Sequence, residues 1–526
     1  MVILRKLVLF WVLMCSVHVH AVSQQLMLDP SFDGDGISEW NTGFYGSGVS
    51  AVAQQSDGKL IYAASGIPQG ASNNTYIAVR MLLDGTIDST FGNNGYVTGR
   101  FDTASTSISV GRKILVQPDG KIILGGYTGD NYTGVIRLNS DGSMDTTFNG
   151  TGNFLLNLTP DYELLTDMAL QPDGKIVIAG YSTSGNGYSG AFLARLLPDA
   201  TPDTTFNGNG FLYDPNYLTS LDQTNSIALQ PDGKILTLGG TLFNNQNRNI
   251  IHRYNPDGSF DVGFGIAGTL ISPIGINDDV PGVIALQPNG KIIVASYTTV
   301  PIPGNPNFSE SDDAIARYNS DGTIDSTFNS DGILIQPVGH YADVPNAIRL
   351  DSFGNIYIAG YANNAPPCMF CVDYDMTLFK LDPDGNIDSS FAYNGIININ
   401  WGIQDNICFD FLIQQDGKFL LAGASSQPSV YNQMAAVRLM PMTTGIDEQQ
   451  TSPSVTAYPN PFNEQLTIRS NGNATLTISD ITGKLIYTAP AHENIQLNTS
   501  KWSRGIYFYR LVTGNDKVVS GRVVKM

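Results

Sequence analysis

The residues best suited to chemistry in this chain are its few cysteines. Four occur in 526 residues, and the stretch "PPCMFC" places Cys368 and Cys371 in a C-x-x-C spacing. This spacing suits a redox disulfide or half of a zinc site, but neither a second pair nor a nearby histidine accompanies it. We therefore expect a structural disulfide in an oxidising compartment, between Cys408 and one of this pair, with Cys371 as the nearer partner.

Aspartates in repeated turns form a second set of candidates. In "NSDGSMD", Asn139, Asp141 and Asp145 have the alternating spacing of a calcium loop, but the further Asp and the bidentate Glu of a complete loop are missing. Asp and Asn also hydrogen-bond to their own backbone in tight turns, where Gly142 supplies a positive φ. We expect turn formation and no cofactor, with calcium as the alternative.

Motifs of common enzyme mechanisms are missing from the sequence. It contains no H-E-x-x-H, no G-x-S-x-G and no G-x-x-x-x-G-K-[ST], and only His252, His340 and His492 follow the N-terminal segment. Paired carboxylates can hydrolyse glycosidic bonds, so acids in loops, for instance Asp278 and Asp312, are also considered. A solvated acidic rim explains these acids without catalysis, and we predict no catalytic residue.

These residues are distributed over a repeat with a period of about sixty residues. The stretch "ALQPDGKIVIAG" at 169–180 has close copies whose glycines are Gly58, Gly120, Gly174, Gly233, Gly290, Gly354 and Gly417. A second motif, "RLNSDGSMDTTFN" from Arg137, runs in step with the first and has six complete copies. Its seventh copy is divided, because Arg438 opens it near the end of the repeats and "LDPSFDGDG" at 28–36 supplies its second half.

Each repeat contains four short segments of alternating or β-branched residues, which predict β-strands. Units of this size cannot bury an apolar face alone, so neighbouring units must cover each other. A divided repeat is what a closed ring requires, because the N-terminal strand then completes the sheet that the C-terminal strand begins. We predict an all-β protein with a seven-bladed propeller over residues 24–441, with an open solenoid as the alternative.

The loops of such a propeller fall on two faces. The nearly constant "PDGK" and "SDGSMD" hairpins share one face, and the variable connections, such as those beginning at Tyr127, Thr241, Tyr297 and Tyr361, share the other. We expect ligand contacts on the variable face, which is rich in Tyr, Phe, Asn and Asp, although these loops are equally explained as tolerated insertions. In the constant turns, we expect Phe148 and its equivalents in the core and Arg137 paired with a neighbouring Asp.

The two motifs in register resemble the bacterial delta-60 repeat of large secreted or surface proteins. The resemblance covers residues 28 to about 440, and it implies a propeller-like fold without any site residues to transfer.

The last part of the chain has a different pattern. After a polar linker at 442–455, residues 456–526 predict a small β-sandwich with no sixty-residue repeat. This segment resembles the type A sorting domain of the type IX secretion system of Bacteroidetes, which implies the secretion machinery as a partner. The match is carried by Tyr458, Pro459, Asn460, Pro461, Phe462, Asp480, Gly483, Lys484, Gly505, Ile506, Tyr507, Val523, Val524 and Lys525.

Charge and the N-terminus indicate the compartment. Residues 1–23 have the order of a secretory signal peptide, and no later run of eighteen apolar residues exists. A net charge of −19 repels nucleic-acid phosphate. We predict a secreted or surface-bound binding or adhesion module for a glycan or protein. The alternative is a secreted enzyme that acts on extracellular polysaccharide with carboxylates at the propeller channel.

Overall fold

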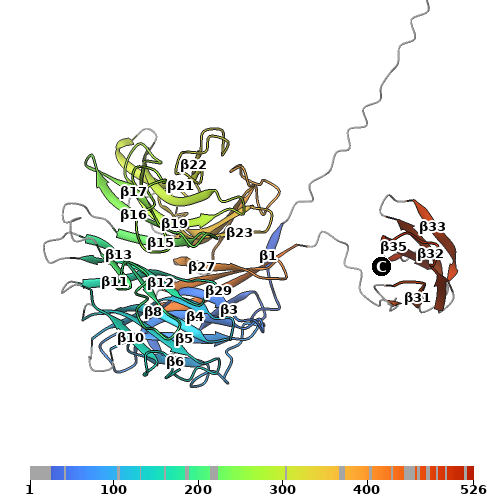
Figure 1. Cartoon of the computed structure of the whole chain (residues 1–526), viewed down its shortest axis with the longest axis horizontal. Helices are drawn as coiled ribbons and strands as arrows, with labels where there is room; N and C mark the ends of the chain where they lie inside the picture. Colours follow the sequence, from blue (N-terminus) through green and yellow to red (C-terminus); the bar gives the residue numbers. More distant parts are fainter. Residues whose placement is uncertain are drawn as a thin grey trace, which may run out of the picture. The chain divides into compact units, whose positions relative to one another are not determined.

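The computed structural model describes residues 25–525 apart from 41–42, 103–106, 131, 159–161, 184–188, 214–222, 303–304, 366–372, 402–404, 428–429, 443–455, 459–461, 470–473, 481–483, 492–493 and 514–517. The chain divides into two compact units, residues 1–442 and 443–526. All the elements described are strands, and accordingly none of the described residues belongs to a helix able to cross a membrane (Figure 1).

The first unit is built from antiparallel sheets of four consecutive strands. Sheet 1 contains β3 (Phe44–Gln54), β4 (Leu60–Pro68), β5 (Thr75–Met81) and β6 (Tyr96–Gly99). Sheet 2 contains β7 (Ser109–Val116), β8 (Ile122–Thr128), β9 (Thr133–Leu138) and β10 (Asn153–Leu156). Sheet 3 contains β11 (Tyr162–Leu170), β12 (Ile176–Thr183), β13 (Ser189–Leu196) and β14 (Phe211–Tyr213).

The next three sheets repeat this order. Sheet 4 contains β15 (Gln223–Leu229), β16 (Ile235–Phe243), β17 (Gln246–Tyr254) and β18 (Thr269–Ser272). Sheet 5 contains β19 (Asp279–Leu286), β20 (Ile292–Ile302), β21 (Asn305–Tyr318) and β22 (Ile333–Gln336). Sheet 6 contains β23 (Asp343–Leu350), β24 (Ile356–Asn363), β25 (Tyr374–Leu381) and β26 (Ile396–Ile399).

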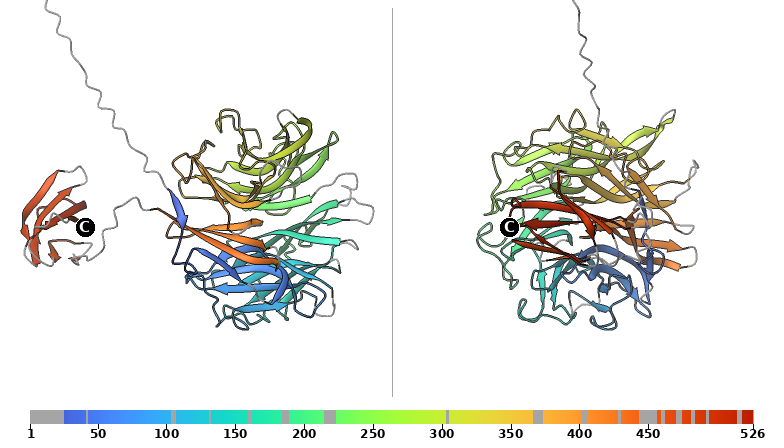
Figure 2. Two further views of the ribbon diagram at one scale, coloured as in Figure 1. Left: turned by 180° about the vertical axis from the view of Figure 1, so that it is seen from behind. Right: turned by 90° about the vertical axis from the view of Figure 1, so that its right-hand side faces the viewer.

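Sheet 7 takes strands from both ends of the repeat region. It contains β27 (Asn406–Ile413), β28 (Phe419–Gln427) and β29 (Val430–Pro441), and both β1 (Leu26–Leu28) and β2 (Ile37–Trp40) pair with β29. Leu26 lies opposite Pro441, and Ile37 lies opposite Val437. Blue β1 accordingly lies beside the orange strands in Figures 1 and 2. The predicted joining of the two ends in one sheet is therefore present.

A repeat counted from the strand after each "F-x-x-x-G" turn does not coincide with one sheet. The strand after each "F-x-x-x-G" turn pairs with the arginine-bearing strand before it, as β6 does with β5, and so forms one edge of that sheet. The connection between these two strands, residues 82–95 in sheet 1, folds back through successive tight turns, such as those closed by the Gly85 N–H on the Leu82 carbonyl and the Gly95 N–H on the Phe91 carbonyl. The chain therefore returns antiparallel into the same sheet. The strand that ends in "ALQ" instead begins each sheet.

The sheets share their cores with their neighbours in a closed series. Each of seven buried apolar clusters combines side chains of two successive sheets, from sheets 1 and 2 through sheets 6 and 7. The remaining cluster joins sheet 7 to sheet 1, for example through Leu420 and Val52. Because no sheet has an apolar face without a partner, each depends on both neighbours for its burial.

A recurrent brace explains why the two sequence motifs stay in register. In sheet 2, Arg137 Nε lies 2.7 Å from Asp145 Oδ2, and Lys121 of the "PDGK" hairpin lies 3.1 Å from the same oxygen. The Arg137 guanidinium also covers the ring of fully buried Phe148, with Cζ 4.8 Å from its centre, and Nη1 donates to the Pro198 carbonyl of sheet 3. Both motifs thus meet at one carboxylate, and the arginine ties each sheet to the next.

We call this arrangement the arginine brace, and it recurs around the first unit. Arginine pairs with aspartate in Arg80–Asp88, Arg195–Asp203, Arg253–Asp261, Arg317–Asp325 and Arg438–Asp29. In sheet 7 the divided motif is reassembled: Arg438 and Lys418 come from one end of the repeats, and Asp29 from the other. Sheet 6 departs from the pattern, because Lys380 replaces the arginine.

The second unit contains two sheets. One is formed by β30 (Thr456–Tyr458), β31 (Gln465–Arg469) and β34 (Asn494–Asn498), and the other by β33 (Leu485–Ala491), β32 (Ala474–Asp480), β35 (Gly505–Thr513) and β36 (Val518–Lys525). A single buried cluster joins them, including Leu466 of β31 and Leu476 of β32. The unit therefore has its own core.

Candidate functional site: the central channel

The first strands of all seven sheets line one channel of about 510 Å³. Each of these strands carries a β-bulge at the same place, where one residue is left without a partner on the second strand. A bulge re-aims side chains and is often found beside functional sites. The seven bulge residues, all of which line the channel, are Ser50, Arg112, Thr166, Asn225, Gly282, Asn346 and Phe409.

Three residues of this bulge ring bind the neighbouring sheet. Thr166 Oγ1 donates to the Thr224 carbonyl at 2.7 Å, and Asn225 Nδ2 donates to the Pro281 carbonyl at 3.1 Å. Asn346 Nδ2 donates to a carbonyl of sheet 7 in the same way. Arg112 and Phe409, by contrast, are exposed in the channel. The ring therefore combines sheet-to-sheet contacts with side chains that a ligand can reach.

Two ion pairs cross between sheets inside the channel. Lys113 Nζ lies 2.8 Å from Asp167 Oδ1, and Asp167 Oδ2 accepts from the backbone N–H of Ile227 at 2.9 Å. Arg349 Nη2 lies 2.5 Å from Asp410 Oδ1. Burial alone would lower the pKa of Lys113, but the carboxylates of Asp167 and Asp410 outweigh it and raise that pKa above its usual value. Both carboxylates are thus engaged by a cation.

Arg112 lies beside a group of tyrosines. Its Cζ is 6.0 Å from the ring centre of Tyr127, whose ring is 6.3 Å from that of Tyr162. Burial raises the pKa of Tyr181, and the positive charge of Arg112 partly opposes this rise. The Tyr181 hydroxyl therefore also lies within electrostatic range of the guanidinium. A permanent cation next to half-buried rings can receive an anionic group while the rings contact an apolar surface.

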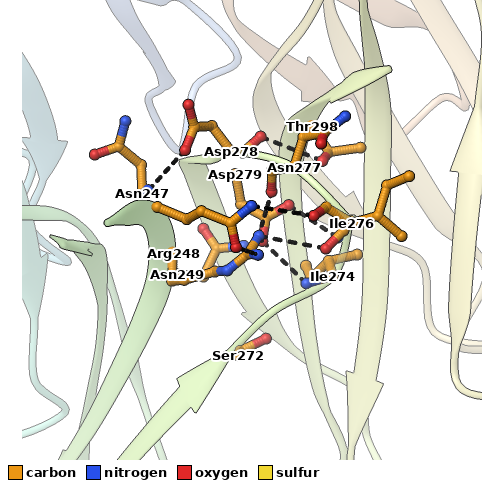
Figure 3. Close-up of polar contacts among 12 residues, drawn as sticks. Asn247, Arg248, Asn249, Ser272, Ile274, Ile276, Asn277, Asp278, Asp279 and Thr298 are labelled. Carbon is orange, nitrogen blue, oxygen red and sulfur yellow. Dashed lines mark hydrogen bonds and ion pairs between the residues drawn. The ribbon is translucent and has the colours of Figure 1, made fainter. Parts of the chain in front are cut away.

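Asp278, one of the acids considered from the sequence, and its neighbour Asp279 are hydrogen-bonded to surrounding loops and strands. Asp278 Oδ1 accepts from the backbone N–H of Asn247 at 2.8 Å (Figure 3). Its neighbour Asp279 is fully buried, accepts from the Gly275 N–H at 2.9 Å, and lies 3.1 Å from Arg248 Nη1. Both side chains therefore hold loops between sheets 4 and 5 rather than line the channel.

Asp312 belongs to an acidic group between sheets 5 and 6. Burial raises its pKa, and the charge of Glu310 raises it further. Asp313 is buried, with Oδ1 lacking a hydrogen-bond partner, and its pKa is raised well above the usual value by burial and then by Asp343. Burial also raises the pKa of Asp343, to about 6. In the part of the chain that the structure describes, no three His, Cys, Asp or Glu side chains are arranged to hold a metal ion.

The turn aspartates are likewise engaged by the protein. Asp141 Oδ1 accepts from the N–H and the hydroxyl of Ser143, and Asp145 pairs with Arg137 in the brace. These contacts are those of the expected turns; the absence of a cofactor stays a prediction, with calcium as its alternative. His252 is a buried residue whose Nδ1 lies 3.0 Å from Thr269 Oγ1.

The cysteine prediction falls partly outside the described residues, which do not include Cys368 and Cys371. Cys408 is a free thiol without exposed surface, and its Sγ donates to the Asp410 carbonyl at 3.3 Å. Its side chain belongs to the core that sheets 6 and 7 share. Because Cys371 lies outside the described residues, the Cys371–Cys408 pairing stays a prediction.

Of the sorting-domain motif, the aromatic residues form a core. Phe462 is buried against Trp502 and Tyr507, with ring centres 6.0 and 6.3 Å away, and its N–H donates to the Val524 carbonyl. Gly505 begins β35 opposite Lys525. Tyr458 and Lys484 are exposed, and the remaining motif residues Pro459, Asn460, Pro461 and Gly483 lie outside the described residues, as does the predicted signal peptide.

Family comparisons agree with both units. A family described as "Domain of unknown function (DUF5122) beta-propeller" matches residues 55–91, 117–148, 171–206, 230–264 and 287–328, and a "Beta-propeller repeat" matches residues 338–366. The first unit thus contains β-propeller repeats. The "Secretion system C-terminal sorting domain" matches residues 456–525, so the protein carries a type IX sorting domain and is secreted or displayed on the cell surface.

Several solved structures are similar to the chain at low identity. The extracellular domain of a protein described as a hybrid two-component system from B. thetaiotaomicron is 12% identical, with a TM-score of 0.40 over 93% of this chain, which spans 57% of that protein. A protein of unknown function from Dyadobacter fermentans is 11% identical, with a TM-score of 0.40, and the match covers 77% of this chain and 99% of that one. The polysaccharide lyase Uly1 is 10% identical, with a TM-score of 0.42, and the match covers 80% of this chain and 98% of the lyase chain. No curated protein matches the sequence.

Proposed function

We propose that the seven sheets are the blades of one closed seven-bladed propeller, with a small sandwich as the C-terminal domain. In this proposal the secreted protein is a non-catalytic module that binds an extracellular glycan or protein at the variable-face end of the channel. The observation that carries the proposal is the bulge ring, where one repeated backbone presents different side chains to one channel. A scaffold with a variable lining is what a binding site on a propeller requires.

The state of the channel acids supports binding over hydrolysis. A glycosidase needs one carboxyl group as proton donor and a second as base or nucleophile. Asp167 is engaged by Lys113 and by a backbone N–H, and Asp410 by Arg349 and by the N–H of Val52. With each carboxylate committed to a cation and the backbone, neither is poised to take part in the reaction.

Tyrosines support a glycan as the ligand. The strands that run from the "PDGK" hairpin toward the variable face carry a half-buried tyrosine at the same place in sheets 2, 3, 5 and 6: Tyr127, Tyr181, Tyr297 and Tyr361. Such rings combine an apolar face with a hydroxyl that can hydrogen-bond, which suits the mixed surface of a sugar. The equivalent residues in sheets 1, 4 and 7 are the small Ser65, Gly240 and Ala424.

The test is a glycan array probed with the full-length chain, run beside an assay for new chain ends on the same polysaccharides. We expect binding to a subset of glycans without the release of new ends. Release of new ends with turnover would support the enzyme alternative instead. If no glycan is bound, the ligand is of another class, and capture of a surface protein would then identify it.

A further inference from the structure

Resting on the proposed binding function, we propose that Arg112 together with Tyr127, Tyr162 and Tyr181 forms a subsite for an acidic sugar, one that carries a carboxylate or a sulfate. The guanidinium would bind the anionic group, and the tyrosine rings would contact the sugar ring. The site lies where the channel meets the variable face between sheets 2 and 3.

The charge balance of the channel singles out Arg112. Five charged side chains line the channel, and four of them form the pairs Lys113–Asp167 and Arg349–Asp410. Arg112 is the fifth, and among the described residues no carboxylate lies within ion-pair distance of its guanidinium. An exposed arginine keeps its charge at any physiological pH and binds planar anions through two parallel hydrogen bonds. In a chain of net charge −19, this channel therefore has a positive surplus.

The position of the arginine on a bulge fixes its direction. Arg112 falls between the pairs Gly111–Gly126 and Lys113–Gly125, and so it has no partner on β8. The rings around it come from two sheets, because Tyr127 lies on β8 while Tyr162 and Tyr181 lie on β11 and β12. All three tyrosines are half-buried, which leaves part of each ring for a ligand.

A second tyrosine group in the same molecule has no cation beside its rings among the residues that the structure describes. In sheets 5 and 6, Tyr361 lies 5.0 Å from Tyr374 and within electrostatic range of Tyr297. The bulge residue of sheet 5 is Gly282, and the nearby charged groups include the acids Glu310 and Asp312. An anionic sugar is therefore expected at the first tyrosine group and excluded from the second by charge.

The experiment measures binding of three probes to the full-length chain by calorimetry: an oligogalacturonate, the same oligosaccharide with its carboxyl groups reduced to alcohols, and dextran sulfate. We expect at least one anionic probe to bind tenfold or more tightly than the reduced probe, and the difference to shrink with added salt. Preference for the oligogalacturonate identifies a uronate ligand, and preference for dextran sulfate identifies a sulfated one.

Matched variants assign the effect to the residues. Arg112→Met should lower the affinity for the anionic probe about tenfold or more while leaving the unfolding midpoint unchanged. Tyr127→Ala should also weaken binding, whereas Tyr393→Ala, at an exposed tyrosine that does not line the channel, should leave it unchanged. Equal affinity for anionic and reduced probes, or full affinity in Arg112→Met, would overturn the acidic-sugar subsite while leaving glycan binding itself standing. Failure to bind any array glycan would instead overturn the glycan form of the proposed function, on which this subsite rests.

Discussion

The arginine brace and the bulge ring occur in the same seven sheets, but the sequence treats them in opposite ways. The brace keeps nearly the same residues in every copy, with aspartate in all and arginine in all but sheet 6. The bulge ring keeps the same backbone and places serine, arginine, threonine, asparagine, glycine and phenylalanine on it. A position whose side chain makes the same contacts in every sheet is restricted, whereas a bulge position, whose side chain bonds to the next sheet in only some copies, can vary.

The two sets also differ in how charge acts. Burial raises the pKa of Asp203, but hydrogen bonds from Thr205 and the charge of Arg195 outweigh it and lower that pKa to about 2. At the variable end of sheets 5 and 6, burial raises the pKa of Asp313, and the charge of Asp343 raises it further. Ionised aspartates therefore stabilise the brace and destabilise the variable end.

The largest effect is expected from opening sheet 7. Deletion of residues 25–40 removes β1, β2 and Asp29, so β29 loses its outer partners and Arg438 its carboxylate. Unpaired strand edges promote association between molecules. We expect aggregation or failure to accumulate as a monomer, measured by size-exclusion chromatography. A stable monomeric deletion protein would show that the pairing of β1 and β2 with β29 is dispensable. It would also show that the brace in sheet 7 contributes no more to stability than the bulge ring does.

Loss of a single brace should have the next largest effect. Arg438→Ala removes the guanidinium from buried Asp29, which keeps its contacts with Lys418 and Ser31, and is expected to cost about 1.5–3 kcal/mol of unfolding free energy. Lys380→Ala is the matched control, because its partner Asp388 is partly exposed and water can solvate the carboxylate. Chemical denaturation followed by tryptophan fluorescence measures both. Equal losses in the two variants would contradict the idea that the arginine contributes through burial.

The pH dependence separates the two kinds of aspartate. The raised pKa of Asp343, about 6, means that its contribution to stability is present below pH 4 and is lost as the pH rises through 6, on the order of 3 kcal/mol. The lowered pKa of Asp203 has the opposite sign, so its contribution is lost as the pH falls from about 4 to 2.

Variants assign the loss between pH 4 and 6. Asp343→Asn should reduce it in denaturation curves. Asn406 occupies the equivalent place in sheet 7, where its Oδ1 accepts from the Trp401 N–H and its Nδ2 has no partner. Asn406→Asp is therefore expected to add a second loss in the same pH range. An unchanged pH profile in both variants would mean that this position is not the source.

Within the ring, tolerance should depend on room for a side chain. A Cβ on Gly282 would lie 2.6 Å from the Ala295 carbonyl oxygen and 2.7 Å from that of Pro345, and neither backbone atom can rotate away. Gly282→Ala should therefore cost about 1–3 kcal/mol. Ser50→Ala, at the equivalent place in sheet 1, should stay within about 0.5 kcal/mol. If both variants unfold at the same denaturant concentration, the ring is more adaptable than its contacts indicate.

The brace was within reach of sequence reasoning, because it depends on spacing inside one motif. The pairing of Arg137 with a neighbouring aspartate, the burial of Phe148 and the joining of the divided motif follow from the repeats alone. They are present as the Arg137–Asp145 pair, a ring without exposed surface, and the Arg438–Asp29 pair. Only the contact to the next sheet, through the Pro198 carbonyl, required the structure.

The channel lining could not be predicted in the same way. A bulge adds one residue to a strand and has no characteristic residue type, and here its members range from Gly282 to Phe409. The pair Lys113–Asp167 joins residues of two repeats, and nothing in either motif marks them. The sequence offered acids such as Asp278 only for the enzyme alternative and favoured a solvated rim, whereas the Asp278 side chain holds a loop. Alternation of hydrophobic residues gives strands, but only the register shows which polar residue faces the axis.

The placement of the closing strand also orders biosynthesis. The chain is made from its N-terminus, so β1 and β2 exist long before β29, which ends at Pro441. The domain that the export machinery recognises begins only after that strand, at residue 456. A translation product that stops before β29 can pair with β1 and β2 therefore also lacks the sorting domain. Because of this order of segments, a product that lacks β29 also lacks the sorting domain and is not secreted.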